Sequence, residues 1–153
     1  MLKANKALLA ALVVTLGTGI ALAATVDDQI KVRQAEMKTN GDSLALLVKI
    51  VRGAAPYDAA TVSAAVKAMQ DAAAASDAAQ AWDASTQTGG TIPTRVKPDI
   101  WTSPDAFAAA QKGFDDALAA LAATSDEAGF KAAFPGLGAA CKSCHQQFRL
   151  ADT

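Results

Sequence analysis

The sequence is poor in the residues on which catalysis and metal binding usually depend. Its 153 residues contain only one histidine and two cysteines. A structural zinc site needs four nitrogen or sulfur ligands, so zinc would require carboxylates or a second chain. No pair of a nucleophile and an activating base can be recognised around the single histidine. We therefore do not expect an enzyme.

The chain also has little net charge and few aromatic residues. The formal net charge is −1, and no cluster of lysine and arginine indicates a surface for nucleic acid. Aromatic residues make up 5% of the chain. Alanine is abundant and runs of β-branched residues are few, which favours helix throughout. The length suits one ordinary domain.

The first 23 residues have the pattern of a signal peptide. Lys3 and Lys6 precede an uncharged apolar stretch, and Ala21-Leu22-Ala23 has the small residues of a cleavage site. We expect cleavage near Ala23, a mature domain over 24–153, and a periplasmic location in a bacterium. The alternative is an uncleaved membrane anchor, although the apolar run is short for a span. No second run of spanning length follows, so we expect no membrane span after cleavage.

Hydrophobic periodicity predicts four helices in the mature chain. Their expected bounds are about 27–51, 58–82, 104–123 and 125–150. The stretch 83–103 contains Gly89-Gly90, Pro93 and Pro98, so it cannot be one regular helix. Loops of this length usually carry function or cover a site. The prediction is an all-α, antiparallel four-helix bundle, with Pro135 either kinking the last helix or marking its restart.

The run Cys141-Lys142-Ser143-Cys144-His145 is the C-x-x-C-H signature of covalent c-type haem attachment. On a helix, residues three and four apart share a face. Cys141 and Cys144 can therefore form thioethers with the two haem vinyl groups, and His145 can bind the iron as the proximal ligand. The predicted cofactor is one covalent haem c.

Three other uses of these residues are possible. A redox-active C-x-x-C belongs at a strand–helix junction, and no strand pattern occurs nearby. A zinc ion would lack ligands in this chain. A disulfide between Cys141 and Cys144 would leave His145 without a role. An apo dithiol protein remains the weakest interpretation, and it predicts no haem absorbance after export.

Four motifs together resemble the class II cytochromes c, the group of cytochrome c′ and cytochrome c556. The resemblance covers the whole mature chain. Its marks are Arg33-Gln34-x-x-Met37, the segment 53–58 (Gly-Ala-Ala-Pro-Tyr-Asp), the segment 97–101 (Lys-Pro-Asp-Ile-Trp), and the run from Cys141 to Arg149 near the C-terminus.

This resemblance implies roles for further residues. It implies that Arg33 and Gln34 lie near the haem propionates, that Met37 is on the distal side of the iron, and that Arg149 lines the proximal pocket. A guanidinium pairs well with a carboxylate, although Arg33 could equally be a solvated surface residue. Pro135 departs from the expected pattern of the last helix. Family members often form homodimers through their first two helices, so a homodimer is possible here.

Met37 separates two functions. If its thioether binds the iron, the haem is low-spin, and the protein is an electron carrier of the c556 type with redox proteins as partners. If Met37 only packs over the iron, the haem is five-coordinate and high-spin, and nitric oxide or carbon monoxide can bind as in a cytochrome c′. Methionine can also be ordinary core filler. We favour electron transfer through a site with His145 and Met37 as metal ligands.

Overall fold

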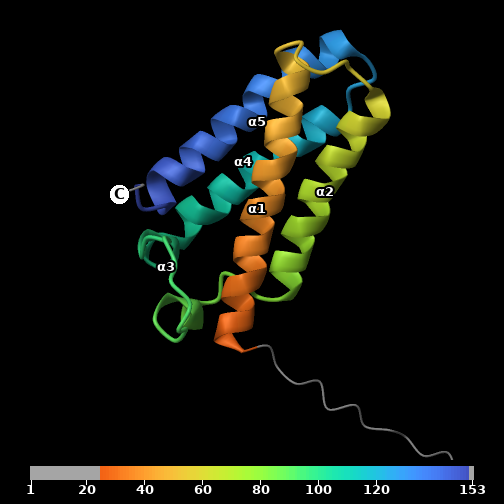
Figure 1. Ribbon diagram of the computed structural model, residues 1–153. Helices are drawn as coiled ribbons and strands as arrows, with labels where there is room; N and C mark the ends of the chain where they lie inside the picture. The colour runs from red at the N-terminus through yellow and green to blue at the C-terminus, as the bar shows by residue number, and fades with distance from the viewer. Residues whose placement is uncertain (1–24, 152–153) are drawn as a thin grey trace, which may run out of the picture.

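Four long helices form an antiparallel bundle, which confirms the predicted all-α fold (Figure 1). The computed structural model describes residues 25–151. The long helices are α1 (Val26–Val51), α2 (Ala59–Ala78), α4 (Pro104–Ala122) and α5 (Glu127–Phe148). Two short elements, η1 (Ala84–Gln87) and α3 (Asp99–Thr102), interrupt the long connection between α2 and α4. The described residues contain no strand, only an isolated antiparallel bridge between Val96 and Arg149.

Side-chain caps fix where three of the long helices begin. Thr25 and Asp28 form a capping box at the start of α1. Asp58 caps α2 by accepting from Thr61 N, and Asp126 caps α5 by accepting from Gly129 N. Ser103 precedes Pro104 at the start of α4, but its hydroxyl makes no capping hydrogen bond. Ser103 is the N-cap residue by position, with Pro104 as the first residue of the helix.

The end of α2 differs from the predicted one, and the structure decides between the two predictions for Pro135. The helix α2 stops at Ala78 instead of continuing to Trp82, because Gln80 takes a left-handed conformation with φ of 52°. Pro135 lies inside α5, which is one continuous helix from Glu127 to Phe148. The alternative of a restart at this proline was therefore wrong. Proline removes one backbone donor, but its neighbours keep the helix intact.

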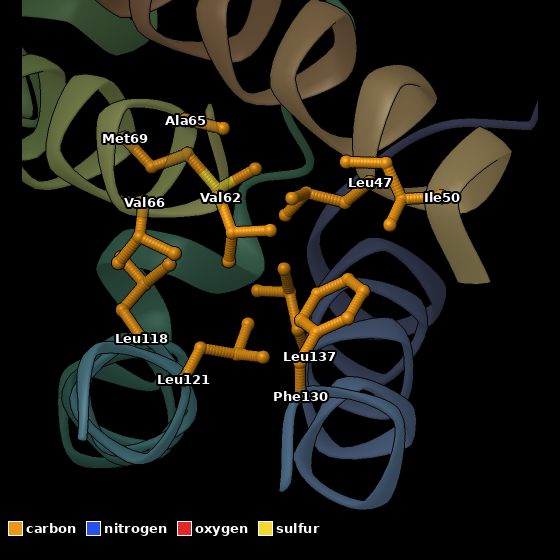
Figure 2. Close-up of a cluster of buried hydrophobic side chains, with 10 residues drawn as sticks. All are labelled: Leu47, Ile50, Val62, Ala65, Val66, Met69, Leu118, Leu121, Phe130 and Leu137. Carbon is orange, nitrogen blue, oxygen red and sulfur yellow. The ribbon is translucent and has the colours of Figure 1, made fainter. Parts of the chain in front are cut away.

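The main hydrophobic core lies at the end of the bundle where α1 leads into α2 and α4 into α5. All four long helices contribute to it, as Figure 2 shows. Leu47, Phe130 and Leu137 have no exposed surface. Its buried members are Leu47, Ile50, Val62, Ala65, Val66, Met69, Leu118, Leu121, Phe130 and Leu137. Burial of this many apolar side chains, at about 1.5–3 kcal/mol for each large one, provides the main drive for folding.

A second, smaller cluster lies toward the other end of the bundle. Ile100, Phe107 and Phe148 are its buried members, and Trp82 packs against Phe107 with ring centroids 5.1 Å apart. Cys141 packs against the main core, whereas Cys144 packs against this second cluster. The face of α5 that carries the two cysteines therefore joins two separate apolar clusters.

The connection between α2 and α4 is fastened to the start of α1. Asp27 accepts hydrogen bonds from Thr91 N at 2.7 Å, from the Thr91 hydroxyl and from Ile92 N. These bonds lower the pKa of Asp27. Gly90 lies so close to α1 that a Cβ atom there would be 2.4 Å from Ile30 Cδ1. Only glycine permits this approach.

Gly90→Ala should therefore destabilise the protein by about 1–3 kcal/mol, because the buried Ile30 side chain would have to shift out of its packing to make room. Gly113→Ala is the matched control. Gly113 is inside α4, and nothing lies within 4 Å of the position that an added methyl group would take, so the change should stabilise by roughly 0.5–1 kcal/mol. Denaturant unfolding of the two variants measures both effects. Equal stabilities would contradict the tight approach at Gly90.

The predicted signal peptide, residues 1–23, lies outside the described residues. Within 25–151, none of the helices is at once long enough and apolar enough to cross a membrane.

Candidate functional site

A large cavity opens between the two apolar clusters. Its volume is about 860 Å³, near the upper end of the range for small-molecule and cofactor sites. Residues of α1, α4, α5 and the α2–α4 connection line it. Side chains from both clusters form its walls, among them Leu44 and Phe114 on one side and Ile100, Phe107 and Phe148 on the other. The bundle therefore encloses an apolar space large enough for a planar cofactor.

The three residues of the C-x-x-C-H motif all line this cavity from α5. Because the motif is helical throughout, Cys141, Cys144 and His145 share one face of the helix. Both cysteines are free thiols. Two thiols and an imidazole directed at one apolar cavity are the donors that covalent haem attachment requires, so the residues present fit a haem c.

The thiols do not have the properties of a redox-active pair. Burial raises the pKa of Cys141, and burial together with Cys141 raises that of Cys144. A reactive dithiol instead needs a lowered pKa and a strand–helix setting. Among the described residues, no three His, Cys, Asp or Glu side chains are grouped so that they could hold a metal ion. The geometry thus favours neither the dithiol nor the zinc interpretation.

The pKa of His145 is shifted in the direction that favours iron ligation. Partial burial lowers the pKa of its imidazole, and the positive charge of Arg149, one turn further on, lowers it again. A neutral imidazole has the free nitrogen lone pair that binds a metal. Arg149 lines the cavity too, and its backbone N–H donates to His145 O at 3.1 Å. Both residues predicted for the proximal side therefore occupy one wall.

Met37 lines the cavity from α1, and it belongs to neither apolar cluster. Its side chain is 37% exposed, an unusual value for a methionine on the inner face of a bundle. Met69 gives the contrast, because it is 1% exposed and packs in the main core. Gly41, one turn after Met37, also lines the cavity and has no atoms within 4 Å of its Cβ position. Met69 is the core filler, and Met37 is not.

Arg33 is buried rather than solvated, with 2% of its surface exposed. Its guanidinium donates to Ala81 O at 3.1 Å, to the Thr86 hydroxyl at 3.0 Å and to the Thr94 hydroxyl at 3.1 Å. It also lies over the ring of Trp82, 5.0 Å from the centroid. Arg33 thus fastens the α2–α4 connection to α1, and both Arg33 and the connection form part of the cavity wall. A further contact with haem propionates stays a prediction.

Gln34 has a similar attachment, because its side-chain amide donates to Pro93 O at 3.0 Å. Both residues line the cavity, as does the connection segment from Pro93 to Val96. The bridge of Val96 with Arg149 ties this segment to the end of α5. The long connection therefore covers the site, as its length suggested.

Glu36 is a site residue that sequence reasoning missed. It is 7% exposed and lines the cavity, and its Oε2 atom has no hydrogen-bond partner among the described residues. Burial raises the pKa of this carboxyl; Asp77 and Asp115 raise it further, whereas Ser76 and Trp82 act in the opposite direction. The only sequence signal was its position three residues after Arg33 on the same helical face.

Glu36→Gln should change how stability depends on pH. A carboxyl with a raised pKa binds more protons in the folded state, so the free energy of unfolding falls as pH rises from its unfolded pKa of about 4.3 through the folded one. The glutamine variant should lose this decline and be more stable than the wild type at neutral pH. Denaturant unfolding of the holoprotein across pH measures it. The exposed Glu127→Gln serves as the control, and parallel profiles for both variants would contradict the prediction.

Comparisons with known proteins agree on one family. The family model described as Cytochrome C' matches residues 28–149. A cytochrome c-556 from Agrobacterium fabrum is 37% identical over 124 residues, covering 80% of this chain and 81% of that protein. A cytochrome c' from Rhodopseudomonas palustris is 35% identical over 156 residues, covering 97% of each.

Solved structures show the same likeness. A nitric oxide complex of a variant of cytochrome c prime from Alcaligenes xylosoxidans has a TM-score of 0.73 and 30% identity, covering 84% of this chain and 98% of that one. The matched region includes the bundle, the cavity and the C-x-x-C-H motif. The chain therefore belongs to the cytochrome c′ family, the class II cytochromes c, and binds one covalent haem c.

Proposed function

We propose that this protein is an exported, periplasmic electron carrier whose single haem is low-spin. In this proposal Cys141 and Cys144 hold the haem through thioethers, and His145 and Met37 bind the iron from opposite sides. The observation that carries the proposal is the position of Met37. It lines the cavity from α1 while His145 lines it from α5, and no packing in the hydrophobic core accounts for its side chain.

The residues of the cavity suit electron transfer. When bound, haem supplies the one-electron chemistry, and methionine–histidine ligation raises its reduction potential. The apolar walls exclude water, and Arg33 and Gln34 hold the covering connection in place. A rigid site keeps the reorganisation energy of electron transfer small. The motif cysteines lie on one continuous helix and would hold the cofactor in a fixed position in the bundle.

Gas binding is the second candidate function. It is supported by the nitric oxide complex among the similar solved structures and by the relatives named cytochrome c'. A thioether is a weak ligand, and release of Met37 would leave the distal position open. Leu44 and Phe114 would then provide an apolar setting for a diatomic ligand.

Carbon monoxide distinguishes the two functions. The ferrous holoprotein should keep its spectrum when carbon monoxide is added, and potentiometric titration should give one reversible one-electron step. A stoichiometric spectral shift with carbon monoxide would contradict ligation by Met37 and favour the gas-binding function. Both measurements use the matured holoprotein.

Export has its own support in the first 23 residues, with two lysines, an apolar stretch and a small-residue cleavage pattern. Intact mass of the protein from a periplasmic fraction should correspond to a chain beginning at Ala24, or one residue later, plus one haem. A mass that retains residues 1–23 would indicate the membrane-anchor alternative.

A further inference from the structure

The exposed charged side chains that line the cavity all have the same sign. They are Arg95, Lys142 and Arg149. The one acidic residue of the lining, Glu36, is buried. The rim of the cavity is therefore positive although the whole chain has a formal charge of −1.

Backbone contacts hold a fourth cation, Lys97, at the same rim. Lys97 N donates to Phe148 O at 2.9 Å, and Lys97 Nζ donates to Gln146 O at 3.0 Å. Arg95 donates to Leu150 O at 3.1 Å. The α2–α4 connection and the end of α5 therefore present their cations together, and we call Arg95, Lys97, Lys142 and Arg149 the basic mouth.

The segment that contains Lys142 and Arg149 has no acidic side chain of its own. Residues 128–151 contain no aspartate or glutamate. On α2 and α4, by contrast, Lys67 and Lys112 are each paired with an aspartate one turn later. Asp77 and Asp115 lie on the side of the cavity at Glu36, whose pKa they raise, and not at the basic mouth. Lys142 makes no salt bridge within residues 25–151. The positive charge is thus gathered on one side of the cavity, at the α2–α4 connection and the end of α5.

We propose that the basic mouth is the docking surface for a redox partner protein whose contact face is acidic, an inference that rests on the proposed electron-carrier function. An apolar centre with a polar rim is the usual anatomy of a protein interface. Leu150, which is 48% exposed, provides an apolar contact, and the basic mouth provides the rim. The two propionates of a haem would offset at most two of these four positive charges. Opposite charge orients the partner and accelerates encounter.

Small redox reagents of opposite charge test the sign of this surface. Hexacyanoferrate(III) is anionic, and tris(phenanthroline)cobalt(III) is cationic. Oxidation of the ferrous holoprotein by each is followed by stopped flow at several ionic strengths. The rate with the anionic reagent should fall as salt increases, and the rate with the cationic reagent should rise, because screening weakens attraction and repulsion alike.

Lys142→Glu should lower the ratio of the anionic to the cationic rate by roughly tenfold. Lys112→Glu on α4 makes the same change in net charge away from the cavity and should leave the ratio close to that of the wild type. Using the ratio removes any effect of the variants on the haem potential. Equal ratios for the two variants would overturn the proposal.

Two further outcomes also decide the matter. A basic patch could instead attract an anionic membrane, so the holoprotein is mixed with vesicles containing phosphatidylglycerol. Vesicle binding that Lys142→Glu abolishes, together with unchanged rate ratios, would overturn the docking proposal in favour of lipid.

A holoprotein that failed to exchange electrons with either reagent would contradict the proposed electron-carrier function itself. If carbon monoxide binds but the haem still exchanges electrons with the two reagents, ligation by Met37 is contradicted while the test of the basic mouth remains valid.

Discussion

Replacing Met37 with alanine should convert the haem from low-spin to high-spin. The change removes the one methionine that lines the cavity among the described residues. Residues 25–151 contain no second histidine to take its place as a ligand. The ferrous α and β bands should broaden, and carbon monoxide should bind. The reduction potential should fall by an amount on the order of tenths of a volt, because axial ligands are a main determinant of haem potentials.

The control for this change is Met69→Leu. Met69 is buried in the main core, so a swap of similar volume should cost less than about 1.5 kcal/mol and leave the spectrum unchanged. Met37→Leu adds a second comparison, since it keeps apolar bulk at the cavity wall while removing the sulfur. If Met37→Ala and Met37→Leu both retained the wild-type spectrum, Met37 would not be the ligand.

Replacing both Cys141 and Cys144 with alanine should abolish covalent haem attachment completely. Each thiol supplies one thioether, and the described residues contain no other cysteine. After denaturation and organic extraction, the wild-type protein should retain its haem absorbance and the double variant should retain none. Either single substitution should leave one bond and a changed pattern of absorbance in the denatured state.

Ser143→Ala is the matched control for the cysteine variants, because Ser143 is exposed and lies between the two thiols on α5. It should retain haem in full. This experiment is independent of Met37, since both the electron-carrier and gas-binding functions need the thioethers. A double variant that kept haem through denaturation would contradict the assignment of the two cysteines.

The sequence predicted the bundle well because its signals are local and periodic. The apolar stripe of α5 placed Cys141 and Cys144 on the inner face, where the structure has them. The end of α2 was predicted four residues too late. The alanine-rich segment has no stop signal, and the left-handed turn falls on Gln80, a residue with no preference for that conformation.

The unpredicted parts of the site depend on contacts between distant residues. The resemblance to class II cytochromes c indicated that Arg33 mattered, but its hydrogen-bond partners lie 48 to 61 residues away. Glu36 would ordinarily be expected on the surface, since glutamate is rarely buried. Its burial results from the packing of α1 against Ser76 of α2 and the connection at Trp82. No local pattern predicts such an arrangement.

The optical spectrum of the ferric holoprotein is the most direct test of the central claim that Met37 and His145 bind one covalent haem iron. The account predicts a low-spin spectrum with a sulfur-to-iron charge-transfer band in the far red, lost in Met37→Ala and retained in Met69→Leu. A high-spin ferric spectrum without that band in the wild-type protein would contradict it, and the open distal site of a gas-binding cytochrome c′ would then be the correct description.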